Sequence, residues 1–302
     1  MLNFVRLSIR SVLEIGEIIK KVRKLEIRSR KLSTNYFSGE YHSAFRGKGM
    51  LFKEVRDYYP GDDIRFIDWN VSARFGHPFS KVFEEERERT VMLIADYSES
   101  INLGSINRTK REMMIEIAAI LGFSALSNGD KIGAILFTDK VEKYIPPLKG
   151  RQHLLFMLRT MISFEPKSPG TDTRAALGFF QKTTRAKSIL FLLGDMNDLE
   201  NHSIVKAIGH RHDAIAIQLH DPKEDALPKA GLIPIEHSET GEVAWIDSNH
   251  KAGRQQWNDF QIRKRQHLQN FLKKAGWGFL LCSTPDDEAA LLQKFFQKRL
   301  HH

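Results

Sequence analysis

Residues 90–100 read Thr90-Val91-Met92-Leu93-Ile94-Ala95-Asp96-Tyr97-Ser98-Glu99-Ser100. The run Val91–Ala95 is continuously apolar, which is typical of a parallel strand that is covered on both faces. Polar residues follow it at the point where such a strand would end. In an open α/β sheet, ligands bind in the crevice outside the carboxyl ends of the strands. This stretch therefore predicts a buried strand with a candidate site at its end.

Strand-length and helix-length patterns alternate from this stretch to the C-terminus. Such alternation predicts an α/β fold with a doubly wound, mostly parallel sheet. The further expected strands are Lys131–Phe137, Val141–Ile145 at an edge, Ser188–Leu193, Ala214–Leu219 and Trp277–Cys282. The expected helices are Lys110–Ser127, Arg151–Ile162, Arg174–Thr183, Ser203–Gly209, Arg254–Ala275 and Asp286–Arg299.

Composition shifts divide the chain into three expected parts. Residues 1–35 predict an N-terminal amphipathic helix, because apolar residues recur there at a spacing of three to four with basic residues between them. Residues 36–89 predict a small β-rich subdomain. Residues 90–302 form the α/β domain, which is expected to carry a hairpin and a basic helix near residues 232–275.

Overall composition excludes several classes of protein. The chain has 302 residues, of which 41% are hydrophobic, so it is neither disordered nor collagen-like. Cys282 is its single cysteine, which excludes a disulfide framework and indicates a small core residue in a reducing compartment. No apolar run approaches the ~20 residues that cross a bilayer. Arg6 and Arg10 interrupt any signal-peptide core, so a cytoplasmic location is expected.

The net charge of +9 is concentrated at the two ends. Residues 1–50 hold eleven Lys or Arg against four Glu, and residues 251–302 hold ten against four acidic residues. Solvated helix faces would explain these basic ends. Contact with nucleic acid, with an anionic membrane surface or with an acidic partner protein would also explain them, and the sequence leaves these alternatives open.

Three expected loops carry oxygen ligands. Asp96, Ser98 and Ser100 follow one strand, Thr171 precedes a helix, and Asp195 follows another strand. Mg²⁺ takes about six oxygen ligands and often retains water. Hydroxyls from the serines and the threonine, with carboxylates that bind directly or through water, therefore predict a Mg²⁺ site, with Mn²⁺ or Ca²⁺ as alternatives. Taken singly, each loop would also fit a helix cap.

In their order and placement, these five residues resemble the metal-ion-dependent adhesion site of von Willebrand factor A domains. Upstream and downstream segments resemble the bacterial family called domain of unknown function 58. These segments are Phe45–Gly49, Glu54–Tyr58, Pro60–Arg65, Ile67–Trp69, Ser72–Arg74, Phe83–Glu86, Glu239–Glu242 and Phe295–Arg299.

The resemblance implies a von Willebrand factor A-like fold and a site that binds a partner carboxylate through a metal ion. The family is often encoded beside MoxR-type AAA+ ATPases, so the resemblance also implies such an ATPase as partner, together with an unknown client protein. Many members of the family have N-terminal membrane spans, and this chain is expected to be of the short kind without them.

The expected β-rich subdomain alternates basic and acidic residues around aromatic ones. Leu51–Tyr58 and Pro78–Phe83 read as its strands, joined through the turn Tyr59–Asp62. The favoured interpretation is a salt-bridge network that clamps the subdomain against the sheet, with Trp69 as a packed anchor. Binding of a partner, a base or a phosphate is the alternative. The residues concerned are Arg56, Asp62, Arg65, Asp68, Trp69 and Arg74.

Taken together, the sequence favours a metal-dependent binding adaptor that is not an enzyme, in which Asp198 and Glu99 would orient metal-bound waters. Binding of nucleic acid or an anionic membrane through the basic terminal helices is one alternative. A metal-dependent phosphohydrolase with Asp96 as nucleophile is another. Ser98 stands where such an enzyme would need a second carboxylate, and no Walker A sequence occurs.

Overall fold

The computed structural model describes residues 50–85, 89–104, 108–199, 202–226, 229–236 and 243–300. The expected amphipathic helix of residues 1–35 lies outside these ranges. None of the helices within them is both long and apolar enough to span a lipid bilayer.

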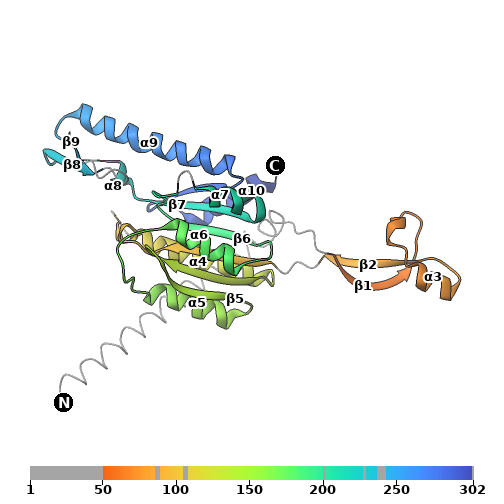
Figure 1. The fold of residues 1–302 in the computed structure, drawn as a ribbon. Coiled ribbons are helices and arrows are strands. Elements are labelled where there is room, and N and C mark those ends of the chain that lie inside the picture. The colour runs from red at the N-terminus through yellow and green to blue at the C-terminus, as the bar shows by residue number, and fades with distance from the viewer. Residues whose placement is uncertain are drawn as a thin grey trace, which may run out of the picture.

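A six-stranded sheet forms the centre of the fold (Figure 1). Its strands are β3 (Thr90–Asp96), β4 (Lys131–Phe137), β5 (Val141–Leu148), β6 (Ile189–Gly194), β7 (Asp213–His220) and β10 (Gly278–Ser283). Their order is β10-β7-β6-β3-β4-β5, and all neighbours are parallel except β5, which runs antiparallel to β4 at one edge. The expected α/β fold with a mostly parallel sheet is thus confirmed, including the edge position of β5.

Helices cover both faces of this sheet. One face carries α4 (Lys110–Ser127), α5 (Arg151–Ser163) and α10 (Glu288–Leu300), and the other carries α6 (Thr173–Thr183), α7 (Ser203–Arg211) and α9 (Lys251–Lys274). Successive side chains of β3 point to opposite faces, so Leu93 packs in the first core and Met92 in the second. Burial on both faces explains why this strand is continuously apolar.

Strand order decides which loops meet. Because β3 pairs with β6 in parallel, Asp96 and Asp195 leave neighbouring strands at the same edge of the sheet. Further elements lie beyond the strand ends: η3 (Glu99–Asn102), α8 (Pro222–Asp225) and the hairpin of β8 (Leu232–Glu236) and β9 (Val243–Asp247). The hairpin confirms the expectation from the sequence, whereas α9 begins three residues earlier than expected.

The expected β-rich subdomain contains a helix that the sequence analysis missed. Strands β1 (Met50–Asp57) and β2 (Phe79–Glu85) form an antiparallel ladder, and α3 (Trp69–Phe75) lies between them in the chain with the short η2 (Ile64–Phe66). Asp68 caps α3 through the amides of Asn70 and Val71, and Gly76 closes it at a φ of 76°. Figure 1 shows this unit at a distance from the six-stranded sheet.

His212, at the end of α7, is buried between the sheet and α6. Its Nδ1 accepts a hydrogen bond from the Ser188 amide at 3.3 Å, and its ring packs on Phe180 at 4.8 Å between centroids. Burial, aided by the charges of Arg211 and Lys187, lowers the pKa of His212 to about 4. In the unfolded chain, the side chain of His212 has its ordinary pKa of ~6.5. The stability that depends on neutral His212 is therefore complete above that pH, and it is lost progressively as the pH falls towards 4.

We therefore expect His212→Asn to flatten the pH dependence of stability, because asparagine keeps an acceptor near the Nδ1 position but does not titrate. Between about pH 7.5 and about pH 5, the wild-type unfolding free energy should fall by about 2 kcal/mol more than that of the variant. Urea denaturation at both pH values measures this difference. His250→Asn, at an exposed histidine, is the matched control and should behave as wild type. Equal losses in wild type and His212→Asn would contradict the expectation.

Candidate metal centre

Asp96 is the last residue of β3, and its side chain is only 3% exposed. Its Oδ1 accepts a hydrogen bond from the Ser98 amide at 2.8 Å, and its Oδ2 accepts one from the Thr171 hydroxyl at 3.1 Å. One buried carboxylate therefore joins the turn that directly follows β3 to a loop 75 residues further along the chain.

The two serines present a pair of neighbouring hydroxyl groups. Ser98 is 5% exposed and precedes η3, yet its side chain makes no capping hydrogen bond there. Its Oγ lies 3.2 Å from the Oγ of Ser100. The helix-cap explanation, which would have assigned Ser98 a purely structural role, therefore does not apply to it. The Glu99 amide donates to the Pro169 carbonyl at 3.0 Å, which holds this turn against the Thr171 loop.

The loop that carries Thr171 is fixed at its far end by two aspartates. Asp172 caps α6 by accepting from the Ala175 amide at 2.8 Å. Asp198, in the loop after β6, accepts from both the amide and the hydroxyl of Thr173 at 2.6 Å. Both carboxylate oxygens of Asp198 thus accept hydrogen bonds from the first residue of α6, which fixes this end of the loop. Its partner lies 25 residues away, and no local pattern in the sequence points to it. The expected role of Asp198 in orienting metal-bound waters stays a prediction.

Gly194, the residue before Asp195, leaves room for the side chain of Asp96 on the neighbouring strand. A Cβ atom on Gly194 would lie 2.7 Å from the Cβ of Asp96, so a larger residue would displace the carboxylate. Burial, followed by the negative charge of Asp195, raises the pKa of Asp96 to about 6, although the hydrogen bonds from Ser98 and Thr171 act in the opposite direction. The next residue, Met196, is buried at a φ of 60°, which is a strained conformation for a residue with a side chain.

The structure thus brings the residues of all three loops to one edge of the sheet. They supply three hydroxyls and two carboxylates, and no Lys, Arg or His in the described parts of the chain pairs with either carboxylate. The same ranges contain no group of three or more His, Cys, Asp or Glu side chains arranged to hold a metal. The donors gathered here are hydroxyl and carboxylate oxygens, which suit Mg²⁺ better than the nitrogen and sulfur ligands typical of Zn²⁺ sites.

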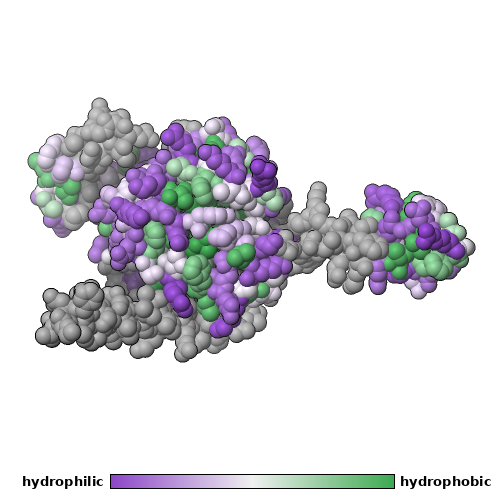
Figure 2. All heavy atoms as spheres, turned by 60° about the horizontal axis from the view of Figure 1, so that its bottom comes forward, coloured by the Kyte–Doolittle hydropathy of each residue, from purple (hydrophilic) through white to green (hydrophobic). Residues whose placement is uncertain are grey.

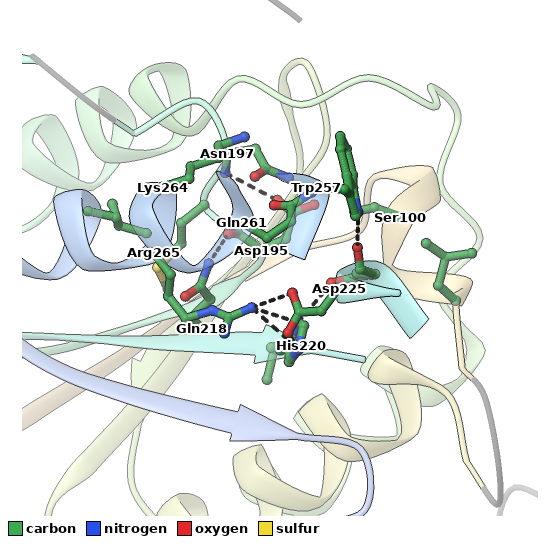
Figure 3. Close-up of a pocket in the computed structure, with 15 residues that line it drawn as sticks. Ser100, Asp195, Asn197, Gln218, His220, Asp225, Trp257, Gln261, Lys264 and Arg265 are labelled. Atoms are coloured by element: carbon green, nitrogen blue, oxygen red, sulfur yellow. Dashed lines mark hydrogen bonds and ion pairs between the residues drawn. The ribbon is translucent and has the colours of Figure 1, made fainter. Parts of the chain in front are cut away.

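A pocket of about 320 Å³ opens beside these residues (Figure 3). Ser100 and Asp195 line it together with Gln218, which lies near the end of β7. One face of α9 contributes Trp257 and Lys264 among others. The sequence predicts a basic helix near this position but does not show that it lines a pocket beside the candidate metal centre.

A buried network of charges fixes this part of α9. His220 lies between two carboxylates of α8, with Nδ1 3.1 Å from Glu224 and Nε2 3.0 Å from Asp225. Lys110, at the start of α4, pairs with Glu224 at 2.5 Å, and Arg265 of α9 pairs with Asp225 at 2.8 Å. The network joins α4, β7, α8 and α9.

The charged residues expected to clamp the subdomain against the sheet pair within the subdomain instead. Arg56 binds Asp62 at 2.8 Å, Arg65 binds Asp63 at 2.6 Å, and Lys81 lies 3.4 Å from Asp68. These pairs brace the turn and α3 of their own unit. Clamping against the sheet was therefore the wrong interpretation for them.

Trp69 is 71% exposed, so its expected role as a packed anchor is also wrong. Tyr59, Ile64 and Phe75 on the same unit are at least 61% exposed, and Arg74 is exposed as well. Figure 2 shows hydrophobic residues at the surface of this unit. A two-stranded ladder with one short helix has too little interior to bury so many large side chains.

Comparisons with known proteins agree with the family resemblance. The sequence profile described as "Protein of unknown function DUF58" matches residues 54–267. The uncharacterised protein Rv1480 of Mycobacterium tuberculosis is 27% identical over 238 residues, which cover 78% of this chain and 75% of that protein.

Two similar solved structures cover most of this chain at low identity. An aerotolerance-related membrane protein from Bacteroides fragilis is 16% identical, with a TM-score of 0.44 over 70% of this chain and 98% of that one. The VWA domain of SpRpn10 is 12% identical, with a TM-score of 0.41 over 70% of this chain and 95% of that one. The family profile spans well over half of the sequence, and on that ground the chain belongs to the family of proteins of unknown function DUF58.

Proposed function

We propose that this protein is a metal-dependent protein-binding adaptor, in which a Mg²⁺ ion captures a carboxylate of a partner protein. The observation that supports the proposal most strongly is the meeting of three loops around Asp96, which gathers hydroxyl and carboxylate oxygens at one edge of the sheet. Mn²⁺ or Ca²⁺ could occupy the same set of ligands.

The proposed roles follow from the chemistry of the side chains. Ser98, Ser100 and Thr171 would supply neutral hydroxyl ligands, while Asp96 and Asp195 would balance the charge of the ion directly or through water. A shell rich in neutral ligands leaves the ion electrophilic. A bound cation would also relieve the repulsion between the two carboxylates. An Asp or Glu side chain from a partner could then complete the coordination.

Binding is favoured over phosphate ester hydrolysis by the surroundings of Asp96. An aspartyl nucleophile needs an accessible carboxylate oxygen. Ser98 replaces the second carboxylate that such an enzyme would need, and Asp96 itself is only 3% exposed. The adaptor is therefore proposed to act without breaking a covalent bond.

The proposed partner is a MoxR-type AAA+ ATPase, with which the adaptor would assemble or mature an unknown client protein. This partner is inferred from the resemblance to the family alone. Binding of nucleic acid or anionic lipid through basic helices remains the alternative, and α9 supports an anionic partner because it carries seven Lys or Arg and one Asp.

Ser100→Ala should weaken Mg²⁺ binding, because it removes one proposed hydroxyl ligand without disturbing the hydrogen bonds of Asp96. We expect a loss of affinity of about tenfold or more, measured by isothermal titration calorimetry on the full chain. Ser127→Ala, which removes an exposed hydroxyl at the end of α4, is the matched control. Unchanged Mg²⁺ affinity in Ser100→Ala would contradict the proposed ligand set.

Asp96→Ala should abolish Mg²⁺-dependent capture of the partner ATPase in an affinity pull-down, and a chelator should have the same effect on the wild type. Since Asp96 also holds two loops, Thr171→Val provides a second variant of nearly unchanged shape that removes one hydroxyl. We expect it to reduce capture by at least about fivefold while the protein remains folded. Capture of the ATPase that resists both substitutions and the chelator would exclude the metal-dependent mechanism.

Asp198→Ala should weaken Mg²⁺ binding indirectly, because the α6 end of the Thr171 loop loses two hydrogen bonds to a carboxylate. The unfolding free energy should fall by about 2 kcal/mol, which urea denaturation measures. Ser100→Ala should leave the unfolding free energy within about 0.5 kcal/mol of the wild-type value. If Asp198→Ala lowers metal affinity at unchanged stability, Asp198 interacts with the metal site directly and the positioning role is wrong.

A further inference from the structure

The pocket beside the candidate metal centre is continuous with it, because Ser100 and Asp195 belong to both. It is also lined by α9 residues at helical spacing. Trp257, Gln261 and Lys264 lie one turn apart in succession, so they share a face of the helix and line the same pocket (Figure 3). Whatever is held at the metal centre would therefore meet this face of α9.

The α9 face that lines the pocket carries two cationic side chains, and only one of them is ion-paired within the described residues. Arg265 is paired with Asp225 at 2.8 Å and approaches the ring of His220. Lys264 is partly buried, and within the described parts of the chain it makes no ion pair or hydrogen bond. The pocket thus contains an ammonium group that is available to an anionic ligand.

The lining of the pocket contains an acceptor that lacks a donor. Gln218 donates from Nε2 to the carbonyl of Asp195 at 3.0 Å, which fixes its orientation beside the metal centre. Its Oε1 is buried without a hydrogen-bond partner in the described residues. A buried acceptor of this kind costs free energy unless a donor reaches it, and an N–H group of a ligand could be that donor.

We propose that this pocket is a second subsite for an acidic segment of a partner protein. One carboxylate of the segment completes the coordination of the metal, a second carboxylate pairs with Lys264, and a backbone N–H donates to Gln218. The inference rests on the proposed function and adds to it a requirement for two acidic residues at a defined spacing.

A peptide fits this pocket better than a nucleic acid does. Every non-proline residue of a peptide carries an N–H donor between its side chains, whereas a DNA sugar–phosphate backbone carries none. Glu224 and Asp225 also line the pocket, but each is paired with a basic side chain, Lys110 or Arg265, so Lys264 offers one available cation for one carboxylate. The basic residues of α9 would also attract an acidic segment electrostatically.

The test uses the full chain and a series of fluorescein-labelled alanine-rich peptides. One peptide carries a single Asp, and the others carry two Asp residues separated by increasing numbers of alanines. Fluorescence anisotropy in Mg²⁺ should show that one spacing binds at least about fivefold more tightly than the single-Asp peptide, as a partly buried ion pair would produce.

Lys264→Met should abolish this advantage while leaving Mg²⁺-dependent binding of the single-Asp peptide unchanged. Lys273→Met is the matched control, because it removes the same charge from an exposed position of α9 that does not line the pocket. The control should retain the full preference for two acidic residues.

Each negative result would exclude a different part of the proposal. If Lys264→Met and Lys273→Met behave alike while single-Asp binding still needs Mg²⁺ and Ser100, the second subsite is wrong and the proposed function stands. If no peptide binds in a Mg²⁺-dependent manner, the proposed function fails as well. A thymidine oligonucleotide that binds despite chelator and loses affinity in Lys264→Met would assign the pocket to nucleic acid and overturn the inference.

Discussion

The hydrogen bonds of one buried carboxylate hold the candidate centre together. Asp96 ends the strand β3, and its two oxygens fix the serine turn on one side and the Thr171 loop on the other. Burying a carboxylate is costly, and placing a second carboxylate beside it raises the cost further, as the raised pKa of Asp96 reflects. The proposed cation would offset this cost by neutralising the two acids.

The rest of the fold serves to bring these groups to one place. Parallel pairing of β3 with β6 sets Asp195 on the neighbouring strand end, and Gly194 leaves room for the side chain of Asp96. Asp198 ties the start of α6 to the loop after β6. Because these supports are tied to strands and helices that pack in two cores, the fold itself sets the positions of these side chains.

The basic helix α9 lies beside the candidate metal centre, whose two carboxylates carry the opposite charge. Arg265 of α9 pairs with Asp225, which also contacts His220, and this charge network anchors the helix beside the pocket that Lys264 lines. Within the described residues, the unit of β1, β2 and α3 has, by contrast, no packed interior of its own. It braces itself with its own ion pairs and exposes large side chains such as Trp69, because it is too small to enclose them.

Most of the α/β framework, and the meeting of the five candidate residues at one edge of the sheet, could be predicted from the sequence alone. The bounds of α4 were predicted correctly because the residues that end it, Asn128 and Gly129, are adjacent in the chain. Strand β3 could be predicted because a strand that is buried on both faces requires a continuous apolar run. Such features depend on a few neighbouring residues, so the sequence determined them.

Other features were decided only by tertiary structure. Three examples are the hydrogen bonds of Asp198 to Thr173, the lining of one pocket by both Lys264 and Ser100, and the exposure of Trp69. All three depend on the arrangement of segments that are far apart in the chain. The same charge pattern around Arg56 fits a clamp against the sheet or a brace within one unit. Which of these forms is determined by the distances between folded elements, and those distances are set by the whole core and not by any local pattern.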